Sequence, residues 1–192
     1  EFRGCVELAK FMMEAIGFDQ DVTYRFSQWD PNDRGKYIGT EEQWNEAQDV
    51  MKRILDHIGV KYTVRVGEAA FYGPKLDIQM KNVHGKEDTL ITVQIDQMLA
   101  ENFGMEYVDR DGEKKRPYII HRTSLGCYER TLALMLEKYA GALPTWIAPE
   151  QVRILSLTER TADVCSEING VLLQEDIRSE LDLRSKKIGY KI

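Results

Sequence analysis

Two neighbouring segments of the sequence, residues 75–81 and 89–96, alternate between apolar and polar residues. A period of two is typical of strands that bury one face, and a turn around His84 and Gly85 separates the two segments. We therefore predict a pair of antiparallel strands with a common apolar face. Its apolar positions are Leu76, Ile78 and Met80 in the first segment and Ile91, Val93 and Ile95 in the second.

The opposite face of the same two strands is polar, and two interpretations of it stay open. It carries Lys75, Asp77, Gln79 and Lys81 on the first strand and Thr92, Gln94 and Asp96 on the second. A half-buried antiparallel strand normally turns such a face to solvent. The alternative is a polar face that lines a substrate cleft.

Helices and further strands are predicted on both sides of this pair. Thr40 and Gln43 form a capping box at the start of a helix that ends at Gly59. The charged residues 109–116 are typical of the tip of a hairpin. The remaining elements are helices over 1–16 and 126–140 and strands over 22–26, 60–66 and 117–121. In the helix over 126–140 the expected buried stripe is Tyr128, Leu132, Met135, Leu136 and Tyr139.

The last part of the chain has a different organisation. Residues 141–149 contain two prolines and predict a linker. A strand over 152–157, a helix over 161–173 and a strand over 181–183 then form the beginning of a βαβ arrangement. Too little sequence follows to cover a parallel sheet on both faces, so this second unit is expected to be truncated.

Composition narrows the function classes. The 192 residues allow one large domain or one and a half average ones, and the net charge of −6 argues against non-specific binding to nucleic acids or membranes. No apolar run is long enough to span a membrane, and the first residues lack the features of a signal peptide. The three cysteines are far apart and odd in number, which favours a reducing cytoplasm over a disulfide framework.

Three places carry side chains of the kinds that act in catalysis or ligand binding. A Gly-Pro turn between Tyr72 and Lys75 brings a hydroxyl and an ammonium close together, although an exposed turn would have the same residues. His121 ends a predicted strand; a lone histidine is usually structural, since a zinc site needs at least three protein ligands. Arg130 lies in the first turn of its helix, against the helix dipole, which makes sense if it faces an anion.

These residues, in this order and spacing, resemble the threonyl-tRNA synthetases, a family of class II aminoacyl-tRNA synthetases. The segment 126–130 corresponds to motif 3 of class II enzymes. The matching segments are residues 67–75, 92–96, 120–122, 126–130, 144–149 and 182–191.

The resemblance implies an α+β fold, with a class II synthetase-like antiparallel sheet flanked by helices and followed by a truncated α/β anticodon-binding domain. Residues 1–148 would be the C-terminal portion of the catalytic domain, with motif 3 at 126–140. Residues 149–192 would be the N-terminal portion of the anticodon-binding domain. The other zinc ligands and motifs 1 and 2 of the family lie upstream of the matching region, so we expect a fragment that is inactive alone.

The resemblance also implies roles for individual residues. Tyr72 and Lys75 would line the threonine and adenylate pocket, and Gln94 would face it as a catalytic and ATP-binding residue. Arg130 would bind the ATP phosphate and act in catalysis. His121 would be one of three protein ligands of a zinc ion that holds the amino and hydroxyl groups of threonine. Such a site selects threonine over valine, which a hydrophobic pocket cannot readily do.

In the second domain, Arg184 and Ser185 would contact the tRNA anticodon. The implied parent is a cytoplasmic threonine–tRNA ligase of protein biosynthesis, a homodimer not bound to membranes. It would activate threonine with ATP and Mg²⁺ and transfer it to tRNA(Thr). The alternative is a truncated paralogue that binds tRNA or a protein without catalysis.

Overall fold

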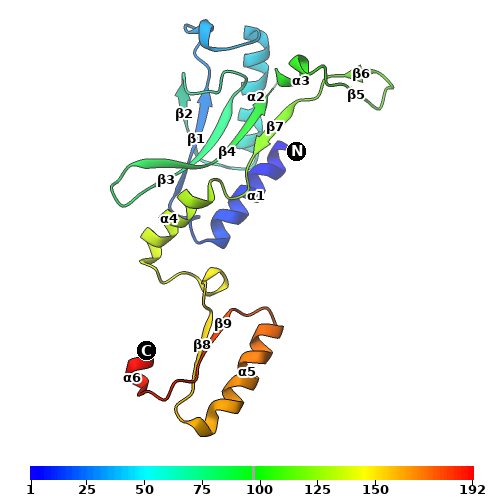
Figure 1. Cartoon of the computed structure of the whole chain (residues 1–192). Helices are drawn as coiled ribbons and strands as arrows, with labels where there is room; N and C mark the ends of the chain where they lie inside the picture. The colour runs from blue at the N-terminus through cyan, green and yellow to red at the C-terminus, as the bar shows by residue number, and fades with distance from the viewer. Residues whose placement is uncertain (97) are drawn as a thin grey trace. The chain divides into compact units, whose positions relative to one another are not determined.

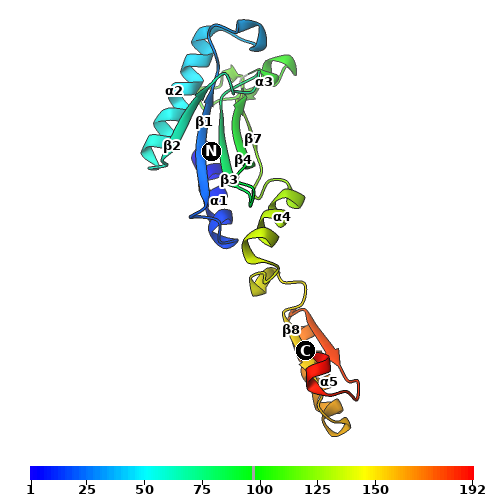
Figure 2. The same cartoon turned by 90° about the vertical axis from the view of Figure 1, so that its left-hand side faces the viewer.

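The computed structural model describes residues 1–96 and 98–192 and divides the chain into two compact units, Glu1–Lys138 and Tyr139–Ile192 (Figure 1). The first unit is built on a five-stranded sheet with the strand order β2-β1-β3-β4-β7, which Figure 2 shows side by side. These strands are β1 (Val22–Gln28), β2 (Tyr62–Val66), β3 (Lys75–Lys81), β4 (Glu87–Asp96) and β7 (Ile119–Arg122).

The expected sheet flanked by helices is confirmed, with one correction. β1–β3, β3–β4 and β4–β7 are antiparallel, but β2 pairs with β1 in parallel, so the sheet is mixed rather than wholly antiparallel. The helix α2 (Glu41–His57) joins these two strands. A parallel pair needs such a crossover. The sequence pattern of β2 does not tell whether this strand pairs in parallel or antiparallel.

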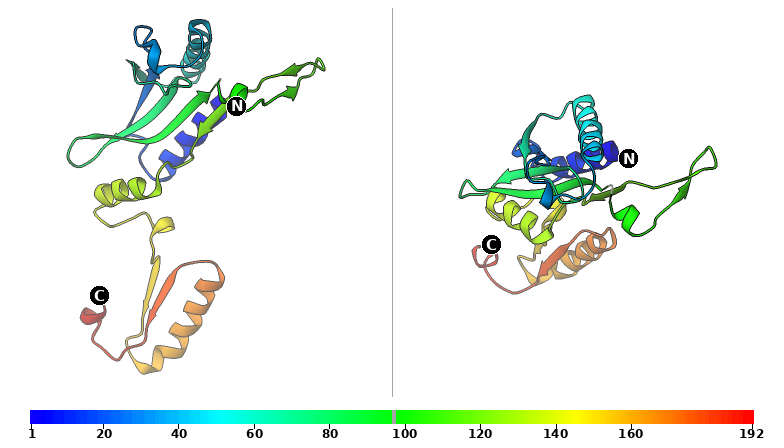
Figure 3. Two further views of the ribbon diagram at one scale, coloured as in Figure 1. Left: turned by 45° about the horizontal axis from the view of Figure 1, so that its top comes forward. Right: turned by 90° about the horizontal axis from the view of Figure 1, so that it is seen from above.

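The predicted apolar face of β3 and β4 is confirmed. Leu76 pairs with Val93 and Ile78 with Ile91, and all four side chains are fully buried. The helix α1 (Phe2–Ala15) packs against β4 and α2, and both helices lie on one side of the sheet in the right-hand view of Figure 3. The capping box at the start of α2 forms as predicted.

A β-bulge interrupts the pairing of β3 with β4 and keeps the polar face continuous. The register shifts between Ile78 and Gln79, so that Gln79 lies opposite Thr89. The amide of Gln79 donates to the hydroxyl of Thr89 at 3.2 Å. The extra residue is Leu90 of β4. Without it, Thr89 would share the apolar face of Ile91.

The buried stripe predicted for the helix α4 (Tyr128–Tyr139) is wrong in part. Its buried residues are Thr131, Leu134 and Met135. Tyr128, Leu132 and Leu136, which were expected inside, are exposed. The helix has apolar residues on two adjacent stripes, and periodicity alone does not say which of them meets the sheet.

A short helix and a small hairpin follow β4. They are α3 (Leu99–Asn102), which the sequence pattern did not predict, and the antiparallel pair β5 (Tyr107–Val108) and β6 (Lys114–Lys115). At the hairpin tip, the ammonium of Lys115 lies 2.5 Å from a carboxylate oxygen of Asp109 and 2.6 Å from one of Asp111. This agrees with the expected charged tip.

The second unit has the predicted βαβ arrangement. β8 (Val152–Leu155) and β9 (Ser179–Asp182) pair with each other in parallel, and α5 (Ala162–Gln174) connects them in the sequence. A short helix, α6 (Ile188–Lys191), ends the unit. The guanidinium of Arg178 donates to the carbonyls of Trp146 and Ala148 at 2.7 and 2.9 Å, which ties the expected linker to this unit. The 3₁₀ turns of the chain are η1 (Arg34–Lys36), η2 (Thr145–Ile147) and η3 (Glu159–Thr161).

Candidate functional site

Three of the expected site residues form one row across the sheet. Lys75 on β3 is the direct partner of Gln94 on β4, and Gln94 is the direct partner of His121 on β7. Side chains of directly paired residues project from the same face of a sheet and are close neighbours. The backbone ladder therefore places an ammonium, an amide and an imidazole next to one another, in that order.

Tyr72 joins this row from the loop that precedes β3. Its hydroxyl donates to the side-chain oxygen of Gln94, and its ring centre lies 5.3 Å from that of His121, tilted by 49°. Burial, and secondly the negative charge of Asp96, raise the pKa of the Tyr72 hydroxyl. The phenol therefore stays protonated at neutral pH and remains a hydrogen-bond donor.

A glycine allows this loop to approach β4 so closely. A Cβ atom on Gly73 would lie 1.8 Å from the carbonyl oxygen of Ile95. No side chain fits there, so only glycine lets the backbone next to Tyr72 reach the strand that carries Gln94.

The polar face of the sheet is a buried network around Asp77. This carboxylate is fully buried and accepts hydrogen bonds from Ser27 at 3.0 Å and Thr92 at 2.8 Å. It also forms ion pairs with Lys75 at 3.0 Å and Arg25 at 3.8 Å. A polar face that simply met solvent would leave Asp77 exposed. Its buried carboxylate instead holds the ammonium of Lys75 in place, which favours the cleft interpretation of the polar face.

Asp96 is a second buried carboxylate, and like Asp77 it was not among the expected site residues. One of its oxygens lies 2.9 Å from Nε2 of His121, and the other accepts from the backbone N–H groups of Met98 and Leu99 at 2.8 and 2.9 Å. The side chain is fully buried. Its position two residues after Gln94, on the same face of β4, was a usable signal in the sequence.

The structure does not bring Arg130 to this group. Its guanidinium donates to the carbonyl oxygen of Thr89 at 2.5 Å. Thr89 lies five residues before Gln94 on β4, which corresponds to roughly 16 Å along an extended strand. Tyr72, Lys75, Gln94 and His121 therefore lie together, whereas Arg130 lies toward the other end of the same strand.

The start of α4 is fixed against the bulge in β4. Gly126 has φ +82°, and a Cβ atom there would lie 1.9 Å from the carbonyl oxygen of Leu90. Both the dihedral angle and the contact require glycine. The start of the helix that carries Arg130 is thus held in close backbone contact with β4, in addition to the packing of its buried side chains.

A zinc ion would find too few ligands among the residues that the structure describes. Within residues 1–96 and 98–192 there is no group of three histidine, cysteine, aspartate or glutamate side chains arranged to hold a metal. Among the described residues, Asp96 is the one carboxylate in contact with His121, whereas zinc sites use at least three protein ligands. The described residues do not by themselves fit the metal.

A family model described as the tRNA synthetase class II core domain (G, H, P, S and T) matches residues 1–139. The chain belongs to this family. The matched stretch contains all the residues of the row and Arg130. In this class II core domain, the row lies on the central sheet.

Relatives with a more specific description match the whole chain. A threonine--tRNA ligase from Clostridium perfringens is 59% identical over 192 residues, which are 100% of this chain and 30% of that protein. One from Bacillus velezensis is 44% identical over 193 residues, again 30% of its length. The crystal structure of the RNA binding domain of threonyl-tRNA synthetase from Cryptosporidium parvum superposes with a TM-score of 0.87 at 31% identity. It covers 98% of this chain and 46% of that one. The chain thus spans about a third of the length of the curated relatives.

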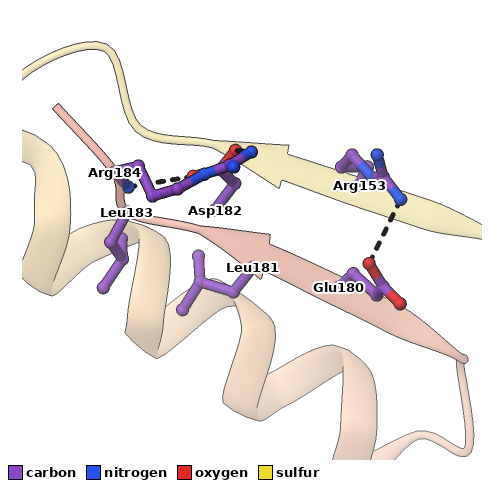
Figure 4. A pocket seen from close by; sticks show the side chains of 6 residues that line it. All are labelled: Arg153, Glu180, Leu181, Asp182, Leu183 and Arg184. Carbon is purple, nitrogen blue, oxygen red and sulfur yellow. Dashed lines mark hydrogen bonds and ion pairs between the residues drawn. The ribbon is translucent and has the colours of Figure 1, made fainter. Parts of the chain in front are cut away.

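Beyond the part matched by the class II core model, Arg184 is held by Asp182. Two guanidinium nitrogens lie 2.6 and 3.0 Å from the two carboxylate oxygens, as Figure 4 shows. This bidentate contact strongly lowers the pKa of Asp182. The guanidinium also lies 5.6 Å from the ring centre of Tyr190, and Ser185 is exposed. Both expected anticodon residues follow β9. Arg184 lines a hollow of about 540 Å³, together with Arg153, Glu180, Leu181, Asp182 and Leu183.

Lys191 was overlooked in the sequence because it ends a charged, surface-like stretch. Its side chain is fully buried and donates to the carbonyl oxygens of Ser156 at 2.6 Å and Asp182 at 3.0 Å. One ammonium thus ties the ends of β8 and β9 together.

Among the described residues, no helix is long and apolar enough to cross a membrane.

Proposed function

We propose that this chain is part of a threonine–tRNA ligase that activates threonine with ATP and Mg²⁺ and transfers it to tRNA(Thr). Residues 1–148 would be the C-terminal portion of its catalytic domain and residues 149–192 the N-terminal portion of its anticodon-binding domain. The observation that carries the proposal is the 59% identity to a threonine--tRNA ligase over the whole chain. The parent enzyme would be a cytoplasmic homodimer.

The row on the sheet is suited to the amino acid. In the activation step a carboxylate oxygen of threonine attacks the α-phosphorus of ATP, and the bond from this phosphorus to the pyrophosphate oxygen breaks. Lys75, fixed by Asp77, would attract the carboxylate and the phosphate. Tyr72 and Gln94 would orient the amino acid for in-line attack.

Arg130 would act on the nucleotide at the other end of β4. A guanidinium can hold a phosphate with two hydrogen bonds and offset the charge that develops on it. The exposed side chain of Arg130, anchored at the carbonyl of Thr89, leaves other N–H groups for this contact. Its distance from Gln94 is consistent with separate places for the amino acid and the phosphates.

His121 would contribute one ligand to a zinc ion, with the remaining ligands supplied by residues outside this chain. Bound zinc would hold the amino and hydroxyl groups of threonine. In the second unit, Arg184 and Ser185 would contact the anticodon of the tRNA. The alternative of a non-catalytic paralogue is not favoured, since the relatives that match the whole chain are described as ligases.

Amino-acid-dependent ATP–pyrophosphate exchange tests the proposal in the longer protein that carries this chain. We expect exchange with threonine and not with valine or proline. Gln94→Ala should lower kcat/KM for threonine at least about tenfold, which corresponds to about 1.4 kcal/mol. Glu87→Gln, an exposed change on the same strand, is the matched control and should leave it unchanged. Exchange driven by another amino acid, or an unaffected Gln94→Ala variant, would contradict the proposal.

The 192-residue chain alone gives a second test. We expect neither threonine-dependent exchange nor stoichiometric zinc, because the described residues contribute only His121 to the required metal ligands. Robust exchange or one bound zinc per chain, at a mass confirmed to be that of these residues, would show that the site is complete within them.

A further inference from the structure

Arg25 lies in a second row of polar residues on the sheet, next to the row that carries Lys75. On β1 it is the direct partner of Asp77 on β3, and Asp77 is the direct partner of Thr92 on β4. Directly paired residues project from the same face of a sheet, and Asp77 shares its face with Lys75, two residues before it on β3. Arg25 therefore belongs to the polar face of the sheet, although the sequence did not single it out.

The carboxylate of Asp77 has no acceptor position left for the guanidinium of Arg25. The two oxygens of a carboxylate accept about four hydrogen bonds. The hydroxyl of Ser27 and the ammonium of Lys75 each lie 3.0 Å from Oδ2. The hydroxyl of Thr92 lies 2.8 Å from Oδ1, and the same ammonium lies 3.3 Å from it. Nε of Arg25 stays 3.8 Å from Oδ2, which is an ion pair without a hydrogen bond.

Nε of Arg25 is consequently a buried donor without an acceptor. Within residues 1–96 and 98–192 it has no hydrogen-bond partner. Nη1 lies 3.3 Å from a carboxylate oxygen of Glu68, but that side chain is 46% exposed, so that water screens this ion pair. A buried donor that lacks an acceptor costs free energy and is rare in folded proteins. Balancing Asp77 does not explain it, because Lys75 and two hydroxyls already do so.

We propose that Arg25 is a further binding residue of the site, and that its guanidinium and the ammonium of Lys75 together hold an oxyanion of the ligand. Both cations are kept next to each other by Oδ2 of Asp77, and the side chain of Arg25 is 20% exposed and thus partly accessible. A guanidinium binds a carboxylate or a phosphate through two parallel N–H groups. The choice between the amino acid and the nucleotide as the source of the oxyanion rests on the proposed function; the donor without an acceptor follows from the contacts of Asp77 alone.

Titration of the ¹⁵N-labelled 192-residue chain with inorganic phosphate and, separately, with acetate tests this donor directly. The Nε–H signal of Arg25 is assigned by its absence from the spectrum of Arg25→Lys. We expect a saturable shift of this signal with at least one of the two anions, because an oxyanion that accepts from Nε changes the shielding of its proton. Chloride at the same ionic strength is the reference. A signal that neither anion moves, or that chloride moves as far, would overturn the proposal.

Equilibrium binding to the longer protein separates the two sources of the oxyanion. If the carboxylate is bound, Arg25→Gln should weaken the binding of threonine about tenfold and leave that of threoninol, which lacks the carboxylate, unchanged. If a phosphate is bound, the same variant should weaken the binding of ATP about tenfold and leave that of adenosine unchanged. Arg3→Gln removes the same charge from an exposed arginine that is paired with Glu7 on α1, and it is the matched control.

Equal weakening of the charged and uncharged ligands would indicate a merely structural role of Arg25 and would overturn the proposal, as would unchanged binding of both threonine and ATP. If Arg25→Gln does not fold, Arg25→Lys gives the same comparison, since an ammonium keeps the charge but cannot offer two parallel donors. An unaltered protein that binds neither threonine nor ATP would contradict the proposed function, whereas the phosphate and acetate titrations would still decide on Arg25.

Discussion

Replacing Gly126 with alanine should destabilise the first unit more than an ordinary glycine substitution does. The backbone at Gly126 has φ +82°, and the added Cβ atom would lie 1.9 Å from the carbonyl oxygen of Leu90. Alanine would be strained by the dihedral angle, and the start of α4 or the bulge in β4 would have to move by more than 1 Å to relieve the contact.

Gly112 is a matched control. Its φ of +81° is nearly the same, but it lies at the tip of the β5–β6 hairpin, and nothing is within 4 Å of an added Cβ atom. The left-handed conformation costs alanine about 1–2 kcal/mol at either position. The steric contact at Gly126 should add about 1–3 kcal/mol, as overpacking of a core does. We therefore expect a loss of about 1–2 kcal/mol for Gly112→Ala and about 2–5 kcal/mol for Gly126→Ala.

Urea unfolding followed by circular dichroism measures both losses as changes in the free energy of unfolding. The difference between the two variants isolates the contact with Leu90, because the backbone conformation is common to both. Equal destabilisation of the two variants would refute the argument that the bulge and the start of α4 are held together by this contact.

Three further predictions concern charged residues. Asp77→Asn should lower the free energy of unfolding by about 1–3 kcal/mol in urea titrations, because Lys75 loses its buried carboxylate partner. Lys191→Met should cost the second unit about 2–3 kcal/mol in the same assay, since two strand-end carbonyls lose their donor, and a loss below 0.5 kcal/mol would contradict this. Arg184 lowers the pKa of Asp182, so this pair stabilises the fold above the ordinary aspartate pKa of about 3.9 and less as the pH falls below it. The Tm difference between the unaltered chain and Asp182→Asn should therefore be greatest at neutral pH and shrink on acidification; a constant difference would count against this linkage.

The apolar face of the sheet was predictable because alternation reports burial directly. Ile78 and Val93 lie on the same face, as their positions in the two patterns required. The parallel pairing of β2 was not predictable from alternation, because neither pairing direction changes which residues face inward. The bulge opposite Gln79 likewise escaped, since a single unpaired residue leaves little trace in a short pattern.

For the site, the row was indicated by the family resemblance, and its supporting residues were not. Tyr72 and Gln94 are in contact, as expected of two residues of one pocket. Asp77 and Asp96 were assigned to the polar face, but a sequence does not tell a buried carboxylate from an exposed one when the covering elements are far away in the chain. Arg130, which the resemblance also assigned to the site, contacts β4 at Thr89, away from Gln94.

The row of Lys75, Gln94 and His121 has a fixed length and a direction. Each step crosses one strand, and neighbouring strands are about 4.8 Å apart, so the two ends are about 10 Å from each other. One end is a cation and the other is an imidazole backed by a carboxylate. A ligand that contacts both ends has its negative group toward Lys75. Because the spacing of neighbouring strands hardly varies, the sheet fixes the distances between the backbone positions of Lys75, Gln94 and His121. Substitutions elsewhere in the molecule can weaken ligand binding, but they leave these distances nearly unchanged.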